Sequence, residues 1–189
     1  MNISNKLPQL IGLAGSFASG KDTIAHKLAE NFGYHTVSTS DILRSVAMKE
    51  RGSIERPVLY EVANEHRHRD GPAVFVKLAL GEPQPLIVTG LRSLGEAKAI
   101  REAGGIILFI DAPIEIRYKR MKDRQRDQEV QLSLEEFKAN EQKEWHIGDG
   151  DADFNIGGIK KMADVVIDNV VPLDEFIDEV YEHLRIAIA

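Results

Sequence analysis

The chain has 189 residues, enough for one domain of ordinary size, and its apolar (43%) and charged (29%) fractions are those of a globular protein. The net charge of −6 argues against a large nucleic-acid-binding surface, and the lack of cysteine excludes disulfides and thiolate metal sites. No apolar run approaches the roughly 20 residues of a membrane span, and the first ten residues lack the apolar centre of a signal peptide. We therefore expect a cytoplasmic protein that does not bind membranes.

The first half of the chain alternates short apolar runs with segments of helical periodicity. We expect strands at the apolar runs and helices where apolar residues recur every three to four positions. The expected strands are residues 9–14 (QLIGLA) and 34–38 (YHTVS), and the expected helices are residues 22–31 and two or three within 41–80, broken at Gly52, Pro57 and Gly71.

The second half of the chain continues the alternation. The expected strands are residues 86–90 (LIVTG), 106–111 (IILFID) and 165–167, and the expected helices are residues 94–103, 113 to about 127, one after the capping-box pair Ser133 and Glu136, and an amphipathic one over 173–184. Strands that alternate with helices predict an α/β fold of three layers, with a five-stranded parallel sheet covered by helices on both faces. Such sheets bind ligands beyond the carboxyl ends of their strands.

The segment GSFASGKDT, Gly15 to Thr23, has the spacing of a Walker A loop, Gly-x-x-x-x-Gly-Lys. A predicted strand precedes it and a predicted helix follows, which is the context the motif requires. The glycines let successive backbone N–H groups point at an anion, and the start of the helix adds its positive dipole end. We therefore expect a loop that binds the phosphates of ATP, formed by Gly15, Ser16, Ala18, Ser19, Gly20, Lys21, Asp22 and Thr23; the alternative is a chance Gly-rich turn.

Asp22 stands where Ser or Thr usually ligates magnesium, and Thr23 comes next. Adenylate kinases also have a threonine one place later, so this resemblance implies that Thr23 is a ligand of Mg²⁺. Asp22 is interpreted as an acidic residue that suits the helix dipole.

The segment VSTSDILR, Val37 to Arg44, resembles the start of the acceptor-binding region of adenylate kinase and its nucleoside monophosphate kinase relatives. Ser40 replaces the glycine of that region. The resemblance implies that Thr39 contacts the acceptor nucleoside and Arg44 its phosphate. It also implies that Asp41 lies near the metal, bound through water.

The segment GLRSLGE, Gly90 to Glu96, resembles a third element of the same kinases. By that resemblance Arg92 would bind the acceptor phosphate and Glu96 would read the acceptor base. The expected acceptor region also contains the basic run His66 to Arg69. These residues either contact the acceptor phosphate or form a solvated helix end.

The segment RYKRMKDRQRD, residues 117–127, resembles the helix in which this family holds two arginines, one turn apart, against the transferring phosphoryl group. Arg120 and Arg124 share a helix face and fit those roles. Arg101, Arg117 and Arg126 are interpreted as solvated helix charges.

The segment ADVVIDN, residues 163–169, is similar to one in dephospho-CoA kinases and adenylate-kinase-like proteins, where the loop lies near the donor adenine. Asn169 is the residue expected there. The polar segment Gly148–Asn155 is interpreted as a loop, because it lacks the glycine and glutamate of a calcium-binding loop.

Together these segments resemble the nucleoside monophosphate kinase superfamily, close to dephospho-CoA kinase and phage deoxynucleoside monophosphate kinase. We expect one kinase domain over residues 1–189, with an acceptor-binding insert (41–80) and a short lid (125–160). The resemblance implies ATP-dependent phosphoryl transfer to a nucleoside or deoxynucleoside monophosphate, with ATP and Mg²⁺ bound, by a monomer or homodimer that does not bind nucleic acid. The expected catalytic residues are Lys21, Asp41, Arg44, Arg92, Arg120 and Arg124.

Two alternatives remain open. Dephospho-CoA kinase phosphorylates a hydroxyl and would need Asp41 as its base. A nucleotide-dependent switch or accessory ATPase is suggested by Thr89, which stands where a Walker B aspartate is usual, and by a lid with few arginines.

Overall fold

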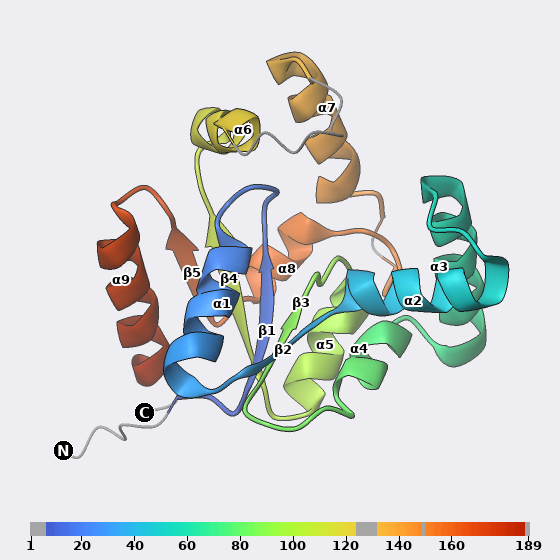
Figure 1. Ribbon diagram of the computed structural model, residues 1–189, viewed down its shortest axis with the longest axis horizontal. Coiled ribbons are helices and arrows are strands. Elements are labelled where there is room, and N and C mark those ends of the chain that lie inside the picture. The colour runs from blue at the N-terminus through green and yellow to red at the C-terminus, as the bar shows by residue number, and fades with distance from the viewer. Residues whose placement is uncertain (1–6, 124–131, 149, 188–189) are drawn as a thin grey trace.

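The computed structural model describes residues 7–123, 132–148 and 150–187 (Figure 1). The strands in these ranges are β1 (Leu10–Gly15), β2 (His35–Ser38), β3 (Leu86–Thr89), β4 (Ile106–Asp111) and β5 (Val165–Asp168). The helices are α1 (Lys21–Phe32), α2 (Thr39–Arg51), α3 (Arg56–Asp70), α4 (Val74–Ala79), α5 (Leu94–Glu102), α6 (Ile114–Asp123), α7 (Leu134–Trp145), α8 (Ile156–Met162) and α9 (Leu173–Ile186).

The strands form one sheet in the order β2-β3-β1-β4-β5, and every neighbouring pair is parallel. This confirms the predicted α/β fold with a five-stranded parallel sheet. The first strand is central, so the loop after it lies between the ends of β3 and β4. All carboxyl ends therefore meet at one edge of the sheet, where a ligand would bind.

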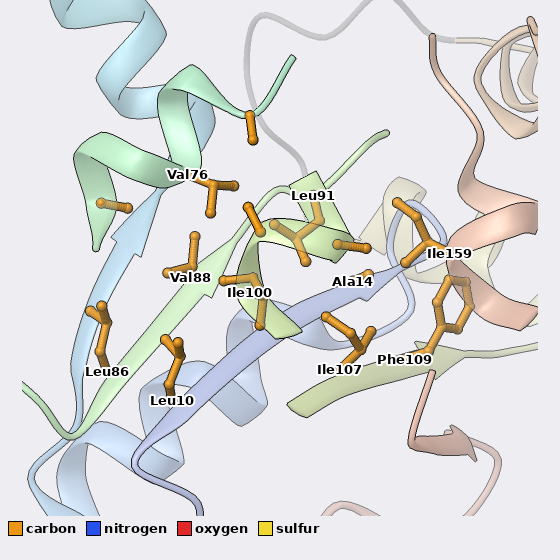
Figure 2. Close-up of a cluster of buried hydrophobic side chains, with 14 of the residues drawn as sticks. Leu10, Ala14, Val76, Leu86, Val88, Leu91, Ile100, Ile107, Phe109 and Ile159 are labelled. Atoms are coloured by element: carbon orange, nitrogen blue, oxygen red, sulfur yellow. The ribbon is translucent and has the colours of Figure 1, made fainter. Parts of the chain in front are cut away.

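Helices cover both faces of the sheet, and alternate residues of the central strands pack against opposite layers. On β1, Leu10 and Ala14 join the cluster beneath α4, α5 and α8, which Figure 2 shows around Val88 and Ile100. Ile11 and Leu13 join the cluster beneath α1 and α9. The apolar runs are therefore buried on both sides, as their lack of polar alternation predicts.

Local signals fix where several helices begin and end. Gly33 ends α1 in the left-handed conformation (φ 72°), and its N–H donates to the carbonyl of Ala29. Ser38 caps α2 by accepting from the N–H of Asp41. The predicted capping box of Ser133 and Glu136 starts α7. Both the loop before α1 and the start of α2 thus lie at the carboxyl edge of the sheet.

The expected insert contains three helices, α2 to α4, within the predicted range of two or three. Helix α8 was not predicted, because its seven residues, IGGIKKM, include two glycines, which disfavour helix. The helix expected to reach about residue 127 is described to Asp123. Among the helices in the described ranges, none combines the length and apolar character needed to cross a bilayer.

Candidate active site

The backbone of the phosphate loop requires glycine at two positions. Gly15 has φ 145°, and a Cβ there would lie 1.9 Å from the carbonyl oxygen of Ile110 on β4. Gly20, at the start of α1, has φ 106°, and a Cβ there would lie 2.4 Å from Nδ2 of Asn169. Both glycines of the motif are therefore required by close packing as well as by conformation.

Side chains from distant segments hold the loop in place. Lys21 folds back so that its Nζ donates to the carbonyl of Ser16 (2.6 Å). Asn169 donates to the carbonyl of Ser19 (2.8 Å). The structure thus places Asn169, expected near the donor adenine, against the phosphate loop. Asp22 is exposed and Thr23 is half-buried in the first turn of α1.

An acidic residue that was not predicted, Asp111 at the end of β4, lies beside the loop. Its carboxylate accepts from the hydroxyl of Ser16 (2.6 Å) and from Nζ of Lys160 on α8 (2.6 Å). Burial raises the pKa of Asp111, but these two hydrogen bonds, a third from the backbone N–H of Ala112 and the charge of Lys160 together outweigh it and hold the pKa below its usual value. The signal was present in the sequence, because IILFID ends in an aspartate on a strand that can neighbour the loop.

The prediction that Arg117 is a solvated helix charge was wrong. Only 6% of its side chain is exposed, and its guanidinium donates to the carbonyls of Ala112 (2.6 Å) and Phe17 (3.3 Å). It also forms a two-pronged ion pair with Glu141 on α7. Because α6 begins three residues after β4 ends, its first turn points back at the phosphate loop. Arg117 thereby joins that loop to α7.

Arg120 lies one turn further along α6 and also reaches the loop. Its guanidinium donates to the carbonyl of Ser19 (3.4 Å) and to the carbonyl and side-chain oxygens of Asn169 (3.1 and 3.2 Å). This places a second guanidinium at the predicted donor site. Arg124, its expected partner, and Arg126 lie outside the described residues.

A cavity of about 310 Å³ opens between the phosphate loop and α7. Its lining mixes positive, negative and aromatic side chains: Ser16, Asp111, Ala112, Arg117, Glu141, Gln142, Trp145 and His146. A space of this size beside a phosphate loop can hold part of a small polar ligand.

The residues expected to bind the acceptor lie at the start of α2, which follows β2. Thr39 is buried, and its hydroxyl donates to the carbonyl of Gly90 (3.0 Å), which ties the start of α2 to the end of β3. Asp41 and Arg44 form an ion pair (2.5 Å) with 72% and 50% of their side chains exposed. An exposed pair contributes about 0–1 kcal/mol, so a phosphate or a metal ion can replace it at little cost.

Arg92 and Glu96 follow β3. The Glu96 carboxylate accepts from the backbone N–H groups of Arg92 (2.7 Å) and Ser93 (3.3 Å), completing a capping box at the start of α5. Its side chain is 2% exposed, and burial raises its pKa. Reading of an acceptor base by Glu96 stays a prediction that would require the carboxylate to leave this cap.

The expected magnesium ligands, Thr23 and Asp41, offer a hydroxyl and an exposed carboxylate. This set fits Mg²⁺, which keeps several waters and takes few protein ligands beside phosphate oxygens. In the described part of the chain, no cluster of three or more histidines and carboxylates could hold a metal ion alone. The two residues would thus hold magnesium only together with the phosphates of ATP.

The chain resembles several known proteins in sequence. It is 26% identical over 186 residues to a UPF0200/UPF0201 protein of Archaeoglobus fulgidus, covering 93% of this chain and 55% of that protein. It is 33% identical over 129 residues to a cytidylate kinase of Natronomonas pharaonis, covering 68% of this chain and 65% of that protein. The chain thus spans only about half to two thirds of the length of these two relatives.

Solved structures share the fold. TT1252 from Thermus thermophilus superimposes with a TM-score of 0.62 at 22% identity, covering 97% of this chain and all of that one. A shikimate kinase from Aquifex aeolicus gives a TM-score of 0.57 at 22% identity, covering 93% of this chain and 95% of that one. A family profile described as AAA domain matches residues 11–146. The chain therefore belongs to this AAA-domain family, and it shares its fold with solved kinases.

Proposed function

We propose that the protein transfers the γ-phosphoryl group of ATP to a nucleoside or deoxynucleoside monophosphate. The observation that supports this proposal is that a phosphate-binding loop and a second group of arginines lie at the same edge of the sheet. One is the phosphate loop with Lys21 and Arg120, and the other is the start of α2 with Arg44, tied by Thr39 to the Gly90 loop before Arg92. The cytidylate kinase relative supports an acceptor of this class.

The chemistry asks little of the protein beyond position and charge. An oxygen of the acceptor phosphate attacks the γ-phosphorus, the bond from the γ-phosphorus to the bridging oxygen breaks, and ADP and a nucleoside diphosphate leave. Lys21 and Arg120 would neutralise the donor, and Arg44 and Arg92 would hold the acceptor against its repulsion by ATP. Since the nucleophile is already an anion, no general base is needed. Magnesium, held by Thr23, Asp41 and the phosphates, would offset charge on the donor.

A hydroxyl acceptor is the second candidate, and one observation favours it. Asp41 presents an exposed carboxylate at the start of α2, where a base for a hydroxyl would stand. Dephospho-CoA is the acceptor to test. Phosphorylation of dephospho-CoA that is lost in Asp41→Asn would support this candidate, and turnover retained in Asp41→Asn would remove Asp41 from that role.

The test is a screen of all ribo- and deoxynucleoside monophosphates, with dephospho-CoA beside them, in the presence of ATP and Mg²⁺. We expect at least one monophosphate to be converted to its diphosphate at a rate far above ATP hydrolysis. Turnover of none of them would contradict the proposal. Slow hydrolysis of ATP that no acceptor changes would instead support an ATPase switch.

A further inference from the structure

Three segments that are distant in sequence meet around the ring of Phe154. The guanidinium of Arg92, after β3, lies 5.4 Å from the centroid of that ring. The guanidinium of Arg67, in the last turn of α3, lies 5.7 Å from it. Phe154 is held there because its backbone pairs with Ser93 and the next N–H, of Asn155, donates to the carbonyl of Arg92 (2.8 Å). Two cations thus approach one aromatic ring.

Arg67 carries a charge that its surroundings compensate poorly. Only 11% of its side chain is exposed, and its contact with Oε1 of Glu96 is long, at 3.5 Å. The other oxygen of Glu96 is used by the cap of α5. The Nε of Arg67 is buried and has no hydrogen-bond partner among the described residues. A largely buried cation that faces two aromatic rings, Phe75 and Phe154, and has one long ion-pair contact is costly, and an anionic ligand would relieve that cost.

Neighbouring cations differ from Arg67 in this respect. Arg69, two residues on, has 62% of its side chain exposed and three hydrogen bonds to Asp70. His66 is buried but contacts the carboxylates of Glu50 and Asp70. Of these three neighbouring side chains, Arg67 is thus the one with a buried donor that has no hydrogen-bond partner among the described residues.

We propose that Arg67 and Arg92, oriented by the ring of Phe154, form a clamp for the phosphate of the acceptor. This inference rests on the proposed function and adds to it Arg67 as a binding residue and Phe154 as a positioning residue. A guanidinium offers paired donors to a phosphate monoester, and an aromatic face fixes its plane. Glu96 competes with the phosphate for Arg67, so the clamp is partly neutralised until the acceptor arrives.

The experiment measures equilibrium binding in the absence of ATP, by calorimetry, for each nucleoside monophosphate and its parent nucleoside. The ratio of the two affinities isolates the contribution of the phosphate. We expect Arg67→Met to lower this ratio about ten- to a hundredfold, the loss expected for charge-assisted hydrogen bonds, and Arg67→Lys to lower it less. Phe154→Leu should also lower it, while Arg69→Met, which removes the same charge from the same helix, should leave it unchanged.

Glu96→Gln gives an independent result of opposite sign. Glutamine retains the capping box but not the charge, so the affinity for the monophosphate should rise while that for the nucleoside stays constant. It also decides the matter if Arg67→Met does not fold, which thermal unfolding would reveal. The clamp is overturned if no monophosphate binds more tightly than its nucleoside, or if folded Arg67→Met and Glu96→Gln both keep the wild-type ratio.

Failure of the clamp and failure of the proposed function give different results. Binding that depends on Arg67, without turnover of any monophosphate, supports the clamp and contradicts the kinase. Turnover with a phosphate contribution that does not depend on Arg67 supports the kinase and contradicts the clamp.

Discussion

The two sides of the phosphate loop are held in opposite ways. On the donor side, the loop is bound directly by three residues with little exposed surface: Asp111, Arg117 and Asn169. On the acceptor side, Asp41 and Arg44 form an ion pair with one another, and both side chains are exposed. The proposed donor site thus has its supporting contacts in place, whereas the proposed acceptor side presents charges that a ligand can take over. A rigid site suits a substrate common to many kinases, and replaceable contacts suit the substrate that distinguishes them.

The largest effect should come from the base of the donor side. Gly15→Ala would put a Cβ into the carbonyl of Ile110, a backbone atom that cannot move without bending β4. We expect a loss of about 3 kcal/mol or more in the free energy of unfolding, or no folded protein. Gly33→Ala is the matched control, because it has a positive φ but no atom within 4 Å, and it should cost about 1 kcal/mol. Equal losses in urea unfolding would show that packing on β4 is unimportant.

The next prediction compares the stability that two ion pairs contribute, Arg117 with Glu141 and Arg44 with Asp41. Arg117→Met should cost about 3 kcal/mol, because it leaves Glu141 and two carbonyls without their partner. Arg44→Met should cost less than about 1 kcal/mol, because its ion pair is exposed. Thermal and urea unfolding of the two variants would measure this difference. A stability loss at Arg44 as large as at Arg117 would contradict the contrast between the sides.

The smallest effect is a pH dependence of opposite sign at the carboxylates of Asp111, which is largely buried, and Glu96, which is fully buried. The folded pKa of Asp111 is lowered, so its stabilisation is present above the unfolded value of about 4 and is lost as pH falls through the folded pKa. The folded pKa of Glu96 is raised, so its stabilisation is present below an unfolded value near 4.5 and is lost as pH rises through the folded pKa.

The isosteric amides would measure this difference. Asp111→Asn should destabilise the protein at neutral pH and lose that penalty in acid. Glu96→Gln should be more stable than wild type at neutral pH and lose that advantage near pH 4. Melting temperatures recorded between pH 3 and 7 would reveal both, and curves parallel to wild type would contradict both assignments.

The fold could be predicted because its signals are local. Uninterrupted apolar runs such as IILFID mark strands buried on both faces, and Gly33 and Ser133 mark helix ends through their own backbone chemistry. The phosphate loop was equally readable, because its spacing and its strand-to-helix context lie within one segment. Helix α8 lacks such a local signal and was therefore not predicted. Its stability comes from Ile156 and Ile159 packing on the sheet rather than from helix propensity.

The candidate site was less readable, because its charges depend on partners distant in sequence. Arg117 looks like any charge on a polar helix until Glu141 and the carbonyl of Phe17 are placed beside it. The Walker B carboxylate was expected at the position of Thr89 on β3. The carboxylate that holds the loop comes instead from β4, on the other side of β1. Phe154 lies in a segment that reads as a polar loop, and its two arginines come from segments 25 residues apart.

The most direct test of the central claim, that the two sides bind different substrates, is steady-state kinetics of Arg44→Met with ATP and the best monophosphate varied independently. We expect the KM for the monophosphate to rise at least about tenfold, kcat to fall, and the KM for ATP to stay within about twofold of wild type. An equal rise in both KM values, or no change in either, would contradict the account.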